Sequence, residues 1–212
     1  MRDGHFGVVI LGGGEATRLP NKLALASDDE LPLIVRVYRN VCGAPGTARE
    51  IVVAGKATFP AHIDARLPVP IVVDRWNRRG PLAGLLTAMG QMQARFVFAV
   101  AGDAPFVDDA FIQTLNRRRL AGCGEARDVE AVVPIRERGG QRQIEPLAAL
   151  YDRLAFVREG LPVLRSGRGS LRVVIARLRT RFVPMEDARA FTNVNTPADY
   201  AALRAQTVGD PP

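Results

Sequence analysis

Short runs of consecutive apolar residues alternate along this chain with longer helix-like stretches. A strand with one solvated face alternates apolar and polar residues, whereas these runs are continuous, so we expect strands that are buried on both faces of a parallel sheet. Strands are predicted at residues 6–11, 51–54, 70–73, 96–101, 131–134 and 181–184. Helices are predicted between and after them, at residues 33–41, 58–67, 81–92, 109–120, 152–161, 170–178 and 197–205.

This order of elements predicts the fold class. Repeated strand–helix–strand units imply right-handed crossovers, and hence an α/β fold: a three-layer αβα sandwich with a mostly parallel, Rossmann-like sheet. We expect one domain over residues 1–212, with its core in 6–205. Residues 122–128 and 136–143 are predicted to be mobile loops, and the tail 208–212 is predicted to fray. Ligands of such sheets bind at the carboxyl ends of the strands, where the chemistry is therefore expected.

The first strand runs into three glycines, and two cationic side chains follow them. Gly12, Gly13 and Gly14 would let backbone N–H groups approach an anion, which Arg18 and Lys22 would neutralise. Lys22 is one of only two lysines in a chain that has 29 Lys and Arg residues together. The spacing matches neither the Walker loop nor the Gly-x-Gly-x-x-Gly dinucleotide pattern. The segment predicts a phosphate cradle, and a plain tight turn is the alternative interpretation.

A carboxylate follows the central strand predicted at 96–101. Asp103 would suit a Mg²⁺ ion beside a polyphosphate, and Gly102 would leave room for the ligand. A helix cap is the alternative role for Asp103, but Asp108 is the better placed cap of the following helix. We therefore predict that Asp103 is the metal ligand of the site.

A second carboxylate and a helix start follow the strand predicted at 70–73. Asp74 would contact a ribose, a base edge or a water molecule, or else pair with a neighbouring arginine. Gly80 and Pro81 form a sharp helix start, whose unpaired N–H groups would lie beside the ligand edge.

A polar segment precedes the last predicted helix. Thr196, Pro197 and Asp199 fit a capping box, with Pro at the first helical position and Asp in place of the usual Glu. The cap does not explain Asn193 and Asn195, which alternate on an extended segment and could point at a ligand.

Composition and charge narrow the function. The chain is 47% hydrophobic and 24% charged, as in a globular protein, with no apolar run long enough to span a bilayer. The formal charge of +7 fits nucleic-acid binding, an anionic substrate or an arginine-rich composition without functional meaning. Few aromatic residues lie among the arginines, so a nucleic-acid partner is not expected, and neither is a membrane. Two cysteines without metal-ligand spacing make a cytoplasmic location the expectation.

The sequence contains no Ser–His–Asp or Cys–His set for nucleophilic catalysis. His5 and His62 are the only histidines, and neither lies in a glycine- or carboxylate-rich context. Charge neutralisation by a metal ion and cationic side chains fits better, because phosphoryl-type transfer depends mainly on positioning and electrostatics.

Five motifs, in this order, resemble the molybdenum cofactor guanylyltransferases, which belong to the wider nucleotidyltransferase family of α/β sandwiches. The matching segments are Leu11-Gly12-Gly13-Gly14 with Arg18 and Lys22, Asp74 with Gly80-Pro81-Leu82-Ala83-Gly84, Gly102-Asp103-Ala104-Pro105-Phe106, Glu145-Pro146-Leu147-Ala148-Ala149-Leu150-Tyr151, and Phe191-Thr192-Asn193-Val194-Asn195-Thr196-Pro197. The resemblance covers residues 6 to 204, and it is the ordered set rather than any single motif that makes it specific.

The resemblance implies a reaction and a set of site residues. GMP would pass from GTP to molybdenum-bound molybdopterin with release of pyrophosphate and with Mg²⁺ as cofactor, and molybdoenzyme maturation proteins would be candidate partners. Asp103 would hold the metal and act in catalysis with Lys22 and Arg18. The nucleotide would contact Leu11, Gly12, Gly13, Gly14, Lys22, Asp74, Gly80 and Asp103. Asn193 and Asn195 would bind the acceptor.

The segment 18–22 departs from the family pattern. It lacks the glycine and the aspartate that usually precede the lysine, and Pro20 stiffens it. Cytidylyl transfer, nucleotidyl transfer to another phosphorylated acceptor, and a catalytically silent nucleotide-binding homologue therefore remain alternatives.

Overall fold

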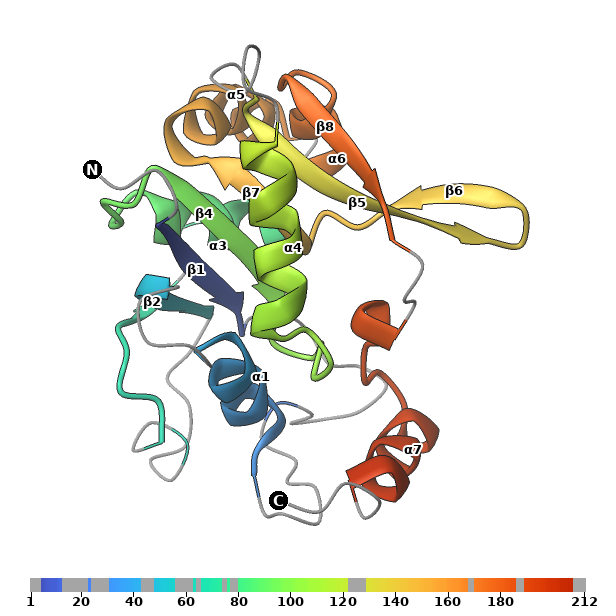
Figure 1. Ribbon diagram of the computed structural model, residues 1–212. Coiled ribbons are helices and arrows are strands. Elements are labelled where there is room, and N and C mark those ends of the chain that lie inside the picture. Colours follow the sequence, from blue (N-terminus) through green and yellow to red (C-terminus); the bar gives the residue numbers. More distant parts are fainter. Residues whose placement is uncertain are drawn as a thin grey trace.

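The computed structural model describes residues 5–12, 23, 31–42, 48–55, 63, 66–73, 76, 80–121, 129–167, 170–185 and 189–207. Within these residues the strands form one eight-stranded sheet in the order β3-β2-β1-β4-β7-β5-β6, and β8 pairs with β5 (Figure 1). The strands are β1 (Phe6–Leu11), β2 (Ala48–Gly55), β3 (Ile71–Val73), β4 (Phe96–Ala101), β5 (Ala131–Arg138), β6 (Gln141–Ile144), β7 (Ala148–Asp152) and β8 (Thr180–Pro184).

The sheet has a parallel half and a mixed half. Strands β3, β2, β1 and β4 are mutually parallel, β7 runs antiparallel to both β4 and β5, and β8 is parallel to β5. Because β7 is antiparallel to both of its neighbours, β4 and β5 point in the same direction, and so does β8, which is parallel to β5. The carboxyl ends of β1 to β5 and of β8 therefore lie at one edge of the sheet, here named the carboxyl edge, and their starts lie at the opposite amino edge.

Helices cover both faces of the sheet. They are α1 (Leu33–Val41), α3 (Gly80–Met89), α4 (Asp109–Leu120), α5 (Arg153–Arg165), α6 (Leu171–Ile175) and α7 (Pro197–Thr207), with the 3-10 helix η3 (Arg189–Phe191) before α7. One apolar cluster joins one face of the sheet to α3, α5 and α6, and a second joins the other face to α1 and α4. Helix α4 crosses the near face in Figure 1, with α3 behind the sheet. The three-layer α/β sandwich is therefore confirmed.

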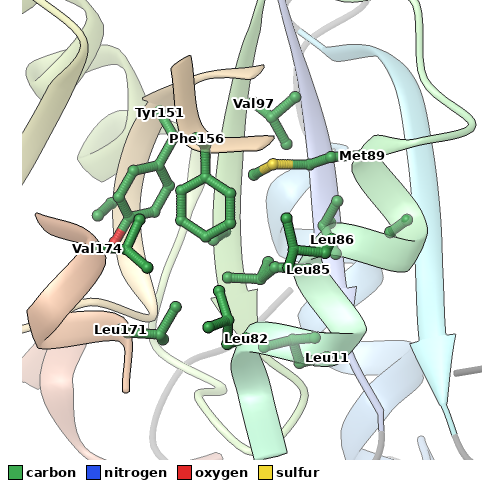
Figure 2. Close-up of a cluster of buried hydrophobic side chains, with 14 of the residues drawn as sticks. Leu11, Leu82, Leu85, Leu86, Met89, Val97, Tyr151, Phe156, Leu171 and Val174 are labelled. Carbon is green, nitrogen blue, oxygen red and sulfur yellow. The ribbon is translucent and has the colours of Figure 1, made fainter. Parts of the chain in front are cut away.

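The core explains why the central strands read as continuous apolar runs. All six residues of β1 and all six of β4 are buried, since successive side chains enter opposite clusters. On the α3 side, Leu82, Leu85, Leu86 and Met89 face Tyr151 and Phe156 (Figure 2). The Tyr151 hydroxyl donates to the Pro146 carbonyl at 2.8 Å, and burial raises the pKa of Tyr151. The buried Tyr151 hydroxyl thus has a hydrogen-bond partner within the apolar layer.

Most predicted elements are confirmed. The bounds predicted for β1, β4, α1 and α4 are those of the structure, and β2, β3, β5, β8, α3, α5, α6 and α7 differ from prediction only at their ends. The helix predicted over 58–67 and the loop predicted at 122–128 lie largely or wholly outside the described residues. Strand β7 was not predicted, because its alanine-rich sequence has low strand propensity and its register against β4 comes from tertiary pairing.

The prediction of a mobile loop at 136–143 is wrong. These residues form a hairpin in which β5 continues to Arg138 and β6 returns from Gln141, with Arg136 opposite Gln143. Gly139 and Gly140 make the turn at φ 59° and 74°, the left-handed region that glycine favours. The hairpin extends away from the sheet in Figure 1, so its side chains are mostly solvated and carry no apolar pattern.

The amino edge carries an ion-pair cluster around a buried glutamate. Glu130, 8% exposed at its side chain, accepts from Arg158 Nη2 at 3.0 Å, from Arg179 Nη2 at 3.1 Å and from the Arg179 backbone N–H at 3.0 Å. Burial raises the pKa of Glu130, but the hydrogen bonds and charges of Arg179 and Arg158 outweigh it and hold that pKa below its ordinary value. The carboxylate ties the start of β5 to α5 and to the start of β8.

Phe156 offers a direct test of the core. It is fully buried with its ring centroid 4.8 Å from that of Tyr151, so Phe156→Ala is expected to lower the free energy of unfolding by about 3–5 kcal/mol. Leu154 lies in the same helix at 64% exposure, so Leu154→Ala should cost less than about 0.5 kcal/mol. Urea unfolding of both variants measures the difference, and equal losses would contradict the packing described.

Glu130 predicts a pH dependence of stability. Because its pKa is lower in the folded than in the unfolded chain, its contribution is present above the unfolded pKa of about 4.3 and is lost as the pH falls through the folded pKa. Glu130→Gln should lower the free energy of unfolding by about 1–3 kcal/mol at neutral pH, and the gap from wild type should narrow towards pH 3. Exposed Glu137→Gln is the control. A gap that does not change with pH would rule out the ionic role.

Candidate active site

Four parallel strands end together at the carboxyl edge. Leu11, the last residue of β1, is the register partner of both Ala101 at the end of β4 and Ala54 in β2. Gly55 at the end of β2 is in turn the partner of Val73 at the end of β3. The predicted site positions 12, 74 and 103 therefore all follow strands that finish at the same edge.

Asp103 lies in a tight turn directly after β4. The Gly102 N–H donates to the Leu11 carbonyl at 2.9 Å, and the Ala104 N–H donates back to the Ala101 carbonyl at 3.2 Å. A Cβ at position 102 would lie 2.9 Å from the Leu11 carbonyl oxygen, so this approach requires glycine. Asp103 itself is half-buried. The turn thus places the Asp103 residue at the carboxyl edge of the parallel half of the sheet.

The alternative role of Asp103 as a helix cap does not apply. Asp108 is the N-cap of α4, and its carboxylate accepts from the Phe111 N–H at 2.8 Å. The Pro105 carbonyl, between the two, accepts from the Asn40 side-chain amide at 2.6 Å. The 103–108 segment is therefore fixed to α1 and α4 without using the Asp103 carboxylate as a cap.

The end of β1 and the start of α3 form the other side of this edge. The Gly12 N–H donates to the Ala54 carbonyl at 2.7 Å, so Gly12 continues the ladder with β2 and its N–H is already occupied. Helix α3 starts at Gly80 with a φ of 68°, which explains the glycine. A Cβ on Gly84 would lie 2.9 Å from the Leu11 side chain, which Figure 2 shows beside Leu82. The first turns of α3 therefore sit against the end of β1.

The C-terminal segment joins Asp103. The Val194 N–H donates to the Asp103 carbonyl at 2.9 Å, and Val194 is buried while Asn193 and Asn195 on either side are exposed. The capping box is confirmed: Asp199 accepts from the N–H groups of Asn195 and Thr196 at 2.9 and 2.8 Å, and its own N–H donates to Thr196 Oγ at 3.1 Å. The hydrogen bonds from Asn195 and then Thr196 lower the pKa of Asp199.

The structure thus brings six of the predicted site residues to one edge, namely Leu11, Gly12, Gly80, Asp103, Asn193 and Asn195. Gly13, Gly14, Arg18, Lys22 and Asp74 lie outside the described residues, so their roles stay predictions. Among the described residues no group of three or more His, Cys, Asp or Glu side chains could hold a metal ion.

Sequence reasoning missed a cation at this edge. Arg189 in η3 places its guanidinium carbon 4.8 Å from the centroid of the Phe106 ring, and Phe106 follows Asp103 by three residues. Phe106 was noted only as part of the motif 102–106. With so many arginines in the chain, position 189 carried no signal of its own, and only the fold brings it next to Phe106.

Many other described arginines lie at the opposite edge. Arg95, Arg158 and Arg179 are exposed there, paired with Asp152 or Glu130, and Arg181 at the start of β8 donates to the Arg118 carbonyl at the end of α4. These cations stand away from the carboxyl edge. The positive charge of the described residues is therefore not concentrated at the carboxyl edge. None of the helices in the described part of the chain is both long and apolar enough to cross a membrane.

Comparisons with known proteins show the family of the chain. The family model described as the MobA-like NTP transferase domain matches residues 8–184. A protein of Bacillus cereus (strain G9842), named a probable molybdenum cofactor guanylyltransferase, is 27% identical over 199 residues, which cover 91% of this chain and 92% of that protein.

Solved structures share the fold. The molybdopterin-guanine dinucleotide biosynthesis protein A of Archaeoglobus fulgidus superposes with a TM-score of 0.75 at 21% identity, over 97% of this chain and 100% of that one. The 4-diphosphocytidyl-2C-methyl-D-erythritolsynthase of Anaerococcus prevotii gives the same TM-score of 0.75 at 12% identity, over 97% of each chain. At these identities the likeness establishes the fold alone. With its family model matched over most of its length, the chain belongs to the MobA-like NTP transferase domain family and is a nucleotidyltransferase.

Proposed function

We propose that this nucleotidyltransferase is a guanylyltransferase that moves GMP from GTP to the phosphate of molybdenum-bound molybdopterin. Family membership and the guanylyltransferase name of the Bacillus relative support the proposal. The single observation that carries it is the hydrogen bond from the Val194 N–H to the Asp103 backbone carbonyl, because it joins the segment expected to hold the acceptor to the residue whose carboxylate is expected at the nucleotide.

In this reaction one bond forms and one breaks. An oxygen of the acceptor phosphate attacks the α-phosphorus of GTP, the bond from that phosphorus to the α–β bridging oxygen breaks, and pyrophosphate leaves with the electron pair. The products are the guanine dinucleotide form of the cofactor and pyrophosphate. No proton transfer by a histidine is needed, because the attacking oxygen is already anionic.

The residues at the carboxyl edge have separate roles in this proposal. The ladder between Gly12 and Ala54 fixes where the glycine segment leaves β1, so phosphate-directed N–H groups would begin at Gly13. The start of α3, seated against Leu11, offers the positive end of a helix dipole. Asn193 and Asn195 would orient the acceptor beside Asp103.

The residues present fit a Mg²⁺ cofactor. Asp103 supplies a hard oxygen ligand in a turn whose glycine lets the chain pass close to β1, and Mg²⁺ commonly takes one or two carboxylates together with substrate phosphates. When bound there, the ion would neutralise charge that develops on the phosphates. The cytoplasmic location and the maturation proteins as partners stay predictions.

Asp103 is the first residue to change. Asp103→Asn should lower turnover about 100-fold or more, because the amide removes the charge that holds the metal while keeping the size of the side chain. Asp108→Asn is the matched control, since asparagine caps a helix as well as aspartate does and Asp108 only caps α4. Pyrophosphate release and thermal denaturation are measured for both variants. An Asp103→Asn enzyme with wild-type turnover would contradict the metal assignment.

The base specificity follows from a nucleotide panel. GTP with Mg²⁺ should raise the melting temperature more than CTP, ATP or UTP, and chelation of the metal should reduce the rise, since a ligand bound to the native state stabilises it. A larger shift with CTP would favour cytidylyl transfer. Stabilisation by GTP without pyrophosphate release in the presence of acceptor would instead indicate a silent nucleotide-binding homologue.

A further inference from the structure

An exposed arginine is held in place beside the acceptor segment. Arg189 lies in η3, four residues before Asn193, and its guanidinium carbon stands 4.8 Å from the centroid of the Phe106 ring. A separation under about 6 Å allows a cation–π interaction, which favours a cation over the face of the ring. Such stacking uses the face of the guanidinium, whereas its hydrogen bonds are donated from its edges.

The ring below Arg189 is itself anchored. Phe106 packs against the apolar cluster of Leu33, Val194 and Leu203. Val194 of that cluster is the residue whose N–H donates to the Asp103 carbonyl at 2.9 Å. The Arg189 guanidinium is thus connected to Asp103 by a ring contact, an apolar cluster and a hydrogen bond.

Arg189 stands on the acceptor side of Asp103. The expected nucleotide side is built from β1, β2 and the start of α3, through the Gly12–Ala54 hydrogen bond and the Gly84–Leu11 contact. The segment with η3 instead leaves the end of β8, where the Met185 N–H donates to the Ile135 carbonyl of β5. Strands β5 and β8 lie beyond β4 from β1, and Figure 1 shows this segment and α7 below them, at the lower right.

We propose that Arg189 binds the phosphate of the acceptor and, with Asn193 and Asn195, positions it for attack on the α-phosphorus. This inference rests on the proposed function, which gives the acceptor a terminal phosphate. A planar guanidinium can donate two parallel hydrogen bonds to a phosphate, and its positive charge attracts the anion. Phe106 serves as the platform that orients the guanidinium. Arg189 acts by binding and orientation and takes no part in proton transfer.

Steady-state kinetics with GTP, Mg²⁺ and molybdenum-bound molybdopterin test the proposal. Arg189→Ala should raise the KM for the acceptor roughly 10- to 50-fold, because one charge-assisted hydrogen bond to the phosphate is lost. It should change the KM for GTP less than about twofold. Arg189→Lys should fall between, because the charge remains while the planar fork is lost. Arg177→Ala, an exposed arginine before β8 at the amino edge, is the matched control and should leave both constants unchanged.

A substitution of Phe106, the ring under the Arg189 guanidinium, is a second test of the proposal. Phe106→Leu keeps an apolar side chain against Leu33 and Val194 but removes the ring, so it should raise the acceptor KM by a smaller factor. In the Arg189→Ala background the same change should add little, because two residues that act as one unit are not additive. Thermal denaturation and the KM for GTP show whether Phe106→Leu has disturbed the fold.

The outcomes separate the two proposals. If wild type forms the dinucleotide and Arg189→Ala leaves the acceptor KM unchanged, or raises the KM for GTP instead, the role of Arg189 is overturned and the proposed function stands. An equal effect of Arg177→Ala would also overturn it, since the effect would then be one of overall charge. If wild type forms no dinucleotide from GTP and this acceptor, both proposals fail.

Discussion

The register between β1 and β4 is the constraint on which the site depends. Leu11 lies opposite Ala101, and one residue further on the Gly102 N–H donates to the Leu11 carbonyl. A slip of one residue would turn over the strand that slips, since each of its side chains would enter the opposite apolar cluster. The hydrophobic cores on the two faces therefore hold this register. As a consequence, Gly12 and Gly102 follow their strands side by side, and no side chain larger than hydrogen fits at position 102.

The two edges of the sheet have different roles: the ion pairs that hold elements together lie at the amino edge, and the candidate site lies at the carboxyl edge. At the amino edge, Glu130 and its arginines tie the starts of β5, β8 and α5 together. At the carboxyl edge, Asn193 and Asn195 are exposed, and Val194 between them bonds to the Asp103 backbone. In the described part of the chain, the ion pairs of Glu130 and Asp152 thus lie at the amino edge, while the Arg189 guanidinium stacks on Phe106, three residues after Asp103.

Much of this arrangement could be predicted from sequence, and the exceptions have physical causes. Strands buried on both faces and helices with clear caps, such as β4 and α4, carry their bounds in local sequence, and so does the capping box at Thr196. The hairpin with β6 was missed because its solvated strands show no apolar pattern, and β7 because its alanines form a strand only against β4. Arg189 could not be singled out, since its partner Phe106 is far away in sequence. The convergence of Lys22 with Asp103 stays a prediction, as Lys22 lies outside the described residues.

The central claim is that a nucleoside triphosphate and its metal lie at the carboxyl edge, with Asp103 as a metal ligand. A crystal structure of the protein with GTP and Mn²⁺ tests it most directly, because anomalous scattering locates the ion without assumptions about the ligand. The account predicts an anomalous peak coordinated by the Asp103 carboxylate, with the triphosphate between the end of β1 and the start of α3. A triphosphate and metal bound at the amino edge, or at the carboxyl edge without contact to Asp103, would contradict it.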